Sequence, residues 1–129
     1  MIDLDRMPAV EDRDPCTLRE VIDSLSEDYA SEYPLEQFWA VAKLYGLTTD
    51  ELEDLLRIGI AKLLREGGVA SYFAKNSIGF APAKQFTGSN EEVTERIVTC
   101  YRAWGGARPF LTGLTFYRYG EKTIPDPID

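Results

Sequence analysis

The amino-acid sequence predicts an α+β fold that is mostly helical, with about four helices, a β-hairpin and a C-terminal strand. Three observations lead to this prediction. Apolar residues recur at helical spacing in several segments, capping residues precede some of these segments, and other segments carry the residue types and alternation of strands. A chain of 129 residues with 44% apolar content can bury one core of its own. We therefore expect a single domain over residues 1–129, with 1–13 and 120–129 as peripheral arms.

The first helix is expected over residues 15–30. Asp14, followed by a proline, is typical of a helix start, because aspartate caps free backbone amides and proline suits the first helical position. The apolar residues that follow at helical spacing are Leu18, Val21, Ile22, Leu25 and Tyr29. Glu20, Asp23 and Glu27 fall on the opposite side of this helix, where we expect them to face solvent.

Two further helices are expected in the middle of the chain. The first begins at Pro34 and ends at Gly46, because glycine adopts the left-handed conformation of a helix C-terminus at little cost. Thr48 and Glu51 match a capping box, in which each side chain accepts a hydrogen bond from the other residue's amide. The helix that follows, over residues 49–66, has a broad apolar stripe, which predicts the most buried helix of the fold.

The second half of the chain predicts strands around a fourth helix. Residues 69–82 place apolar and aromatic residues on both sides of a Lys-Asn-Ser turn signal, so we expect a β-hairpin. Ser89 and Glu92 form another capping-box pattern, which predicts a helix over residues 90–104. Residues 109–120 are rich in β-branched and aromatic types and predict a strand.

The order of helix, turn, helix and hairpin over residues 34–82 resembles a winged helix-turn-helix, a fold often used to bind DNA. In that fold the N-terminal residues of the second helix meet the bases. Here the helix that would do so begins TDELED, and its carboxylates would repel phosphates. DNA reading by this helix is therefore disfavoured. A winged-helix-like regulator or protein-interaction adaptor remains the alternative function, with contacts from the hairpin and from Lys75, Lys84, Arg96, Arg102 and Arg108.

The absence of histidine excludes several classes of active site. It removes Ser-His and Cys-His pairs, His-ligated zinc and the usual general base near neutral pH. Cys16 and Cys100 are too few for a four-thiolate zinc site, and the residues after Cys16 lack the Cys-x5-Arg spacing of phosphatase loops. The acidic runs do not match a calcium loop. We therefore expect a protein that is not an enzyme and holds no metal or cofactor, with catalysis by carboxylates as a third hypothesis.

Nothing in the sequence indicates a membrane or secretory segment. No apolar run approaches the length of a membrane-spanning helix, and the N-terminal MIDLDRMPAVEDRD lacks the basic start and apolar stretch of a secretory signal. We therefore expect a cytoplasmic protein with no membrane partner and with both cysteines as free thiols.

The charge of the chain is distributed unevenly. Residues 1–54 hold fifteen Asp and Glu against four Lys and Arg, whereas residues 55–129 hold seven acids against ten bases. Nine of the acids fall within residues 11–36. This asymmetry indicates an electrostatic partner, while a solvated and solubilising helix face would explain the same pattern. Both interpretations remain open from sequence.

On the partner hypothesis, an acidic helical face with exposed tyrosines beside it binds a basic protein. Like charges this close repel one another, and a partner that carries Lys and Arg would relieve the repulsion and gain a steered encounter. The expected partner-binding residues are Glu20, Asp23, Glu27, Asp28, Tyr29, Glu32, Tyr33 and Glu36.

Two stretches of the chain resemble the small acidic immunity proteins of bacterial polymorphic toxin systems, including contact-dependent growth inhibition. The stretches are LEQFWAVAKLYGLTTDELEDLLRIGIAKLLREGG and GSNEEVTERIVTCYRAW, which together cover about two fifths of the sequence. The resemblance implies a single cytoplasmic domain without catalytic residues that neutralises a basic toxin, such as a nuclease, through an acidic surface. It assigns no binding residue by motif, so the residues named above follow from the charge pattern.

Overall fold

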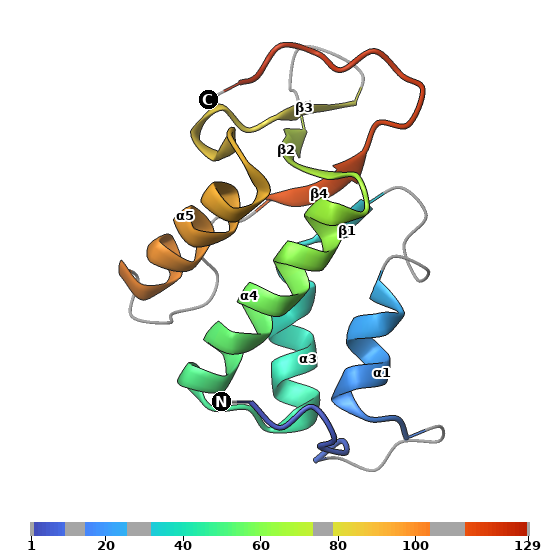
Figure 1. The fold of residues 1–129 in the computed structure, drawn as a ribbon, viewed down its shortest axis with the longest axis vertical. Helices are drawn as coiled ribbons and strands as arrows, with labels where there is room; N and C mark the ends of the chain where they lie inside the picture. The colour runs from blue at the N-terminus through green and yellow to red at the C-terminus, as the bar shows by residue number, and fades with distance from the viewer. Residues whose placement is uncertain (1, 10–14, 26–31, 74–78, 104–112, 129) are drawn as a thin grey trace.

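The computed structural model describes residues 2–9, 15–25, 32–73, 79–103 and 113–128. Within these ranges it contains four α-helices and a four-stranded antiparallel sheet, which confirms the predicted α+β fold. The elements in chain order are α1 (Leu18–Asp23), β1 (Glu32–Pro34), α3 (Gln37–Tyr45), α4 (Thr49–Arg65), β2 (Gly68–Phe73), β3 (Phe80–Pro82), the 3-10 helix η1 (Lys84–Phe86), α5 (Asn90–Ala103) and β4 (Thr115–Arg118). The sheet lies toward one end of the molecule, and α1, α3 and α4 extend from it (Figure 1).

Helix α1 begins at Leu18 rather than at residue 15. Thr17 is its N-cap: the Glu20 amide donates to the Thr17 hydroxyl, and the Thr17 amide donates to the Glu20 carboxylate, each at 3.2 Å. This reciprocal capping box satisfies two free amides together, so it sets the start of the helix. Asp14, the predicted cap, and residues 26–31 lie outside the described residues.

The second predicted helix does not begin at Pro34, because residues 32–34 form strand β1. In this strand Tyr33 lies opposite Phe116 of β4. The strand order of the sheet is β1-β4-β2-β3, so β1 is an edge strand, where a proline that lacks an amide donor is tolerated. Helix α3 begins at Gln37 and ends before Gly46, whose φ of 62° is the left-handed conformation that the sequence predicts.

Helix α4 is the central helix, as its broad apolar stripe predicts. Thr48 and Glu51 form the expected capping box, and seven residues of the helix are buried. The helix contacts both α3 and α5. Gly59 permits the close approach to α3, because a Cβ at this position would lie only 2.3 Å from the ring of Phe38. The predicted bounds of 49–66 agree with the observed helix.

The predicted hairpin is present as β2 and β3, with Tyr72 opposite Ala81. Strand β4 pairs with the other side of β2, so the hairpin is part of a larger sheet. The capping box of Ser89 and Glu92 precedes α5, as predicted. The expected C-terminal strand is confirmed at β4, while residues 109–112 lie outside the described ranges.

The two faces of the sheet have different surroundings. Side chains alternate along a strand, and Tyr33, Ala70 and Phe116 share the inner face, where they are buried in the core with residues of the helices. The opposite face, which we call the outer face, carries Glu32 and Pro34 of β1, Thr115 and Tyr117 of β4, Val69, Ser71 and Phe73 of β2, and Phe80 and Pro82 of β3.

The two ends of the described chain lie against the rest of the fold. Ile2 is buried, and its amide donates a hydrogen bond of 3.0 Å to the Asp54 carboxylate on α4. Residues 121–127 are exposed, and Ile128 forms a bridge with the residue that follows β3.

Candidate functional site

The structure describes part of the acidic segment, residues 11–36, in which the expected partner-binding residues lie. Glu20 and Asp23 are exposed on α1, as helical spacing predicts. Glu32 lies in β1 and Glu36 immediately precedes α3, and both are partly exposed. The predicted contacts that lie outside the described residues are Glu27, Asp28 and Tyr29.

Tyr33 does not belong to an exposed surface, which corrects one of the predicted partner contacts. Its side chain is 3% exposed, and its ring packs against Phe38 with the ring centroids 5.1 Å apart. The reason is the strand conformation of residues 32–34, in which Glu32 and Pro34 take the outer face and Tyr33 points into the core.

Three carboxylates of this segment have no counter-charge in the described part of the chain. Across those ranges, Asp23, Glu32 and Glu36 form no ion pair. Glu20 caps α1, and the Arg19 guanidinium beside it lies 3.5 Å from Asp5 instead. The negative charge of these three residues is therefore not neutralised by the described residues.

Aromatic side chains gather on the outer face of the sheet. The Phe80 ring stacks on Tyr117 with the centroids 4.7 Å apart, and edge contacts extend this pair to Phe73 at 5.6 Å and to Tyr119 at 4.8 Å. We call these four residues the aromatic cluster. The Tyr119 hydroxyl lies 2.8 Å from the Ser71 hydroxyl, so the cluster covers the middle of the outer face.

A pocket of about 210 Å³ joins the acidic segment to the aromatic cluster. We call it the acidic-aromatic pocket, and it is lined by Glu32, Pro34, Glu36, Phe80, Gly113, Leu114 and Thr115. Of these lining residues, Glu32 lies in β1, Glu36 immediately precedes α3 and Phe80 lies in β3. Residues far apart in the sequence thus place charge and aromatic surface at one point.

Thr115, which lines this pocket, carries a buried hydroxyl. Its side chain is 4% exposed, and its Oγ1 has no hydrogen-bond partner among the described residues. Ser71, directly opposite on β2, differs because its hydroxyl bonds to the Val69 carbonyl and to Tyr119. A buried hydroxyl without a partner costs about 1–3 kcal/mol. A residue that lines the pocket therefore carries a buried polar atom without a partner among the described residues.

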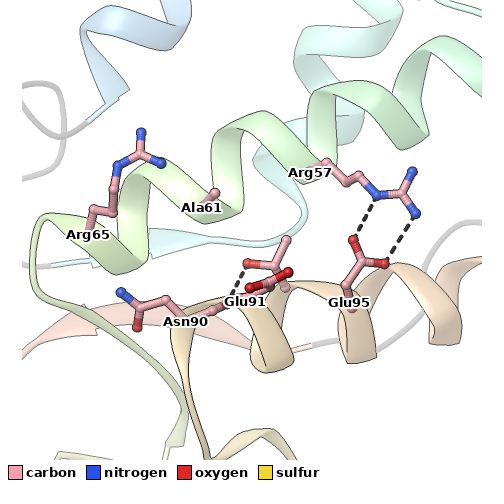
Figure 2. A pocket seen from close by; sticks show the side chains of 7 residues that line it. Arg57, Ala61, Arg65, Asn90, Glu91 and Glu95 are labelled. Carbon is pink, nitrogen blue, oxygen red and sulfur yellow. Dashed lines mark hydrogen bonds and ion pairs between the residues drawn. The ribbon is translucent and has the colours of Figure 1, made fainter.

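A second hollow, of about 330 Å³, lies between α4 and α5 (Figure 2). Arg57 reaches across one end of it and donates to both carboxylate oxygens of Glu95, at 2.9 and 3.2 Å. Its Nη1 also donates to Glu53, one turn earlier on α4, at 2.9 Å, and Arg102 contacts the same carboxylate. We call these four residues the α4-α5 ion network. Its charges are satisfied within the chain.

The α4-α5 ion network shifts the pKa values of its own members. The hydrogen bond from Arg102 lowers the pKa of Glu53, and that from Arg57 lowers the pKa of Glu95. The bond to Glu95 is the main cause of the raised pKa of Arg57. The network therefore joins the two helices through charge-assisted hydrogen bonds.

Two of the basic residues expected for a regulator form ion pairs with glutamates. Arg96 lies 3.5 Å from Glu92, one turn earlier on α5, and Arg102 belongs to the α4-α5 ion network. Lys84 is exposed. The other two, Lys75 and Arg108, lie outside the described residues.

The described residues contain no group of three His, Cys, Asp or Glu that could hold a metal ion. Cys16 and Cys100 are free thiols, each partly buried. The Cys16 carbonyl accepts a hydrogen bond of 2.7 Å from the Tyr45 hydroxyl, which gives this segment a structural contact. In the same described ranges, no helix combines the length and the apolar character needed to cross a membrane.

Sequence reasoning missed the aromatic cluster and Thr115. The alternation of residues 115–119 was a usable signal, because a period of two places Thr115, Tyr117 and Tyr119 on one face of a strand. Phe80 joins them only because β3 pairs with β2 and β2 pairs with β4, and these are long-range pairings that the sequence does not display.

A scan against protein-family models, a search of curated proteins and a search of solved structures each found no match to this chain. Its function must therefore be inferred from the chemistry of the surfaces described above.

Proposed function

We propose that this chain is a non-enzymatic immunity protein that binds a cognate basic toxin, such as a nuclease, and neutralises it in the cytoplasm. The observation that carries the proposal is the set of carboxylates on Asp23, Glu32 and Glu36, which form no ion pair in the described part of the chain. The resemblance of residues 35–68 and 88–104 to immunity proteins supports the same function.

Carboxylates without counter-charges favour a basic partner for an energetic reason. Like charges repel one another in the free protein, and the Lys and Arg residues of a partner replace that repulsion with attraction. The electric field also steers the encounter, which raises the association rate at low salt. The net charge of −8 strengthens this attraction at long range. Neutralisation by binding of this kind needs no catalytic group.

The placement of the basic residues supports this proposal over a nucleic-acid regulator. Phosphate binding requires cations that are free to contact the backbone of the nucleic acid. Arg96 and Arg102 instead pair with glutamates, and Arg6 pairs with Glu51 at the start of α4, at 2.9 Å. At these three arginines, phosphates would have to compete with carboxylates already in place.

The size of the acidic-aromatic pocket favours a protein side chain over a small-molecule substrate as its occupant. Small-molecule sites typically enclose about 300–1,000 Å³, whereas this pocket has a volume of about 210 Å³. A single side chain of a protein partner fits such a volume better than a substrate does.

The test of the proposed function uses the product of the reading frame immediately upstream, where a toxin gene is expected. Mixing the two purified proteins should give a stable complex in size-exclusion chromatography and should abolish the activity of the toxin. Absence of both the complex and the neutralisation would overturn the proposal.

A charge-reversal variant tests whether the acidic segment carries this binding. Asp23→Lys combined with Glu36→Lys should slow association about tenfold or more at low salt, because charges at the rim of a protein interface act mainly on the association rate. The effect should shrink at 1 M salt, where the Debye length is about 3 Å. The matched control, Asp50→Lys with Glu91→Lys, changes the net charge equally at exposed acids on α4 and α5.

Circular dichroism would establish that both variants fold. Equal slowing by the two variants would show that only the total charge matters, and the assignment of the binding surface to the acidic segment would then be wrong.

A further inference from the structure

We infer that the acidic-aromatic pocket receives one arginine side chain of the basic partner. The inference rests on the proposed function for the existence of that partner and adds the chemistry of the residue that it inserts. Three features of the pocket carry it: the carboxylates of Glu32 and Glu36, the hydroxyl of Thr115 and the ring of Phe80.

The carboxylates set the charge of the occupant. Glu32 and Glu36 reach the pocket from β1 and from the residue before α3, and neither forms an ion pair in the described ranges. A cation between them would bond to one or both carboxylates, and charge-assisted bonds of this kind are about twice as strong as neutral ones. The occupant therefore carries positive charge.

Thr115 is an independent indication that a hydrogen-bonding group enters the pocket. Acidic residues alone would attract any cation from solution, whereas a hydroxyl that is 4% exposed and without a partner among the described residues needs a group that comes inside. Thr115 shares the outer face with Pro34, its cross-strand neighbour, and both line the pocket. A donor placed there would bond to Oγ1 while remaining near the carboxylates.

Phe80 selects arginine over lysine. The guanidinium group is planar, stacks on aromatic rings and offers five donors, whereas the lysine ammonium is a compact, strongly hydrated charge with three. One planar group can contact the ring, bond to a carboxylate and donate to the Thr115 hydroxyl. The volume of about 210 Å³ holds one such side chain.

The direct test is an NMR titration of the full chain with three short peptides. The probes are acetyl-Gly-Arg-Gly-amide, the lysine peptide of the same length, and the citrulline peptide, which keeps the shape of arginine without its charge. We expect the arginine peptide to move the amide signals of residues 113–115 and of Glu36. The lysine peptide should bind at least about threefold more weakly than the arginine peptide, and the citrulline peptide at least about tenfold more weakly. Equal affinity for the arginine and lysine peptides, or for the arginine and citrulline peptides, would overturn the inference, as would shifts confined to other parts of the protein.

Variants of the pocket separate its role in binding from a role in structure. Glu32→Gln with Glu36→Gln should lower the affinity for the arginine peptide about tenfold or more. Asp50→Asn with Glu91→Gln, which removes the same charge at the starts of α4 and α5, should leave the affinity within about twofold of the parent's.

Thr115→Val is the most discriminating variant, because its expected effects on stability and on affinity have opposite signs. It keeps the shape of the side chain and removes the unpaired hydroxyl, so the melting temperature should rise while the affinity for the arginine peptide falls about threefold or more. An unchanged affinity would show that the bound arginine does not reach the Thr115 hydroxyl, and the inference would be wrong.

The failures of this inference and of the proposed function are distinguishable. If the chain neutralises the upstream toxin and the pocket variants bind that toxin as tightly as the parent does, the proposed function stands. The inference that the pocket receives an arginine side chain is then overturned. If the pocket binds the arginine peptide with the expected selectivity but the upstream toxin is neither bound nor neutralised, the chemistry of the pocket stands and the proposed function fails.

Discussion

Two regions of this molecule hold acidic residues in different surroundings. Between α4 and α5, the carboxylates of Glu53 and Glu95 are bonded to arginines. Along the segment from α1 to the start of α3, Asp23, Glu32 and Glu36 have no ion pair within the described ranges. The comparison shows that the number of acids does not identify a binding surface. Acids without an ion pair also occur elsewhere in the described chain, so the informative property is that three of them lie in one short segment.

The cause of the difference is the spacing of arginines along the elements. Arg57 stands one turn after Glu53 on α4, and the packing of α5 brings Glu95 to the same guanidinium (Figure 2). The acidic segment contains Arg19 as its only basic residue between 15 and 36, and this side chain lies near Asp5. No comparable network can form from the residues of that segment itself.

The largest effect is expected from breaking the α4-α5 ion network. Arg57→Met keeps much of the apolar stem and removes the charge that joins Glu53 and Glu95. We expect the free energy of unfolding to fall by about 1–2 kcal/mol, because a bidentate pair and a second carboxylate are both left without this donor. Urea unfolding at neutral pH measures the change.

The matched change in the other region is Asp23→Asn. It should alter the free energy of unfolding by less than about 0.5 kcal/mol, as exposed substitutions usually do. If both variants lost the same stability, the distinction between paired and unpaired acids would be wrong.

A smaller effect should appear when the same comparison is made across pH. Arg57 lowers the pKa of Glu95 from the ordinary value of 4.5, and Arg102 and Arg57 lower that of Glu53. A lowered pKa in the folded state contributes stability that is present above pH 4.5 and is lost as the pH falls through the lowered value. The difference in stability between the parent and Arg57→Met should therefore shrink over the acid range below pH 4.5. A difference that stayed constant over this range would show that Arg57 acts through packing rather than charge.

Local signals in the sequence predicted the helices that carry the ion network. The pair Thr48 and Glu51 marks the start of α4, and Ser89 and Glu92 mark the start of α5, because capping boxes depend only on neighbouring residues. The start of α1 was misplaced because Asp14 was preferred over Thr17, although Thr17 and Glu20 match the same pattern.

The pocket could not be predicted, because long-range pairing builds it. Strand β1 has three residues, too few to show a period, and it exists because β4 pairs with it. The inward direction of Tyr33 and the neighbourhood of Thr115 both follow from that pairing. The charge of Glu32 and Glu36 was predictable from sequence, whereas their meeting with Phe80 was not.

The smallest effect tests the acidic segment in the free protein. Asp23→Asn with Glu32→Gln removes negative charge that has no counter-charge in the described part of the chain and that does not stand at a helix start, so we expect the free energy of unfolding to rise by about 0.2–0.5 kcal/mol at low salt. The gain should disappear near 1 M salt, where charges are screened beyond about 3 Å. The control Asp50→Asn with Glu91→Gln should have the opposite sign, because Asp50 and Glu91 stand in the first turns of α4 and α5, where negative charge stabilises a helix by about 0.3–1 kcal/mol. Urea unfolding at the two salt concentrations measures both variants. A loss of stability in the Asp23 and Glu32 variant would mean that these carboxylates already have a favourable partner within the chain, and the contrast between the two regions would then fail.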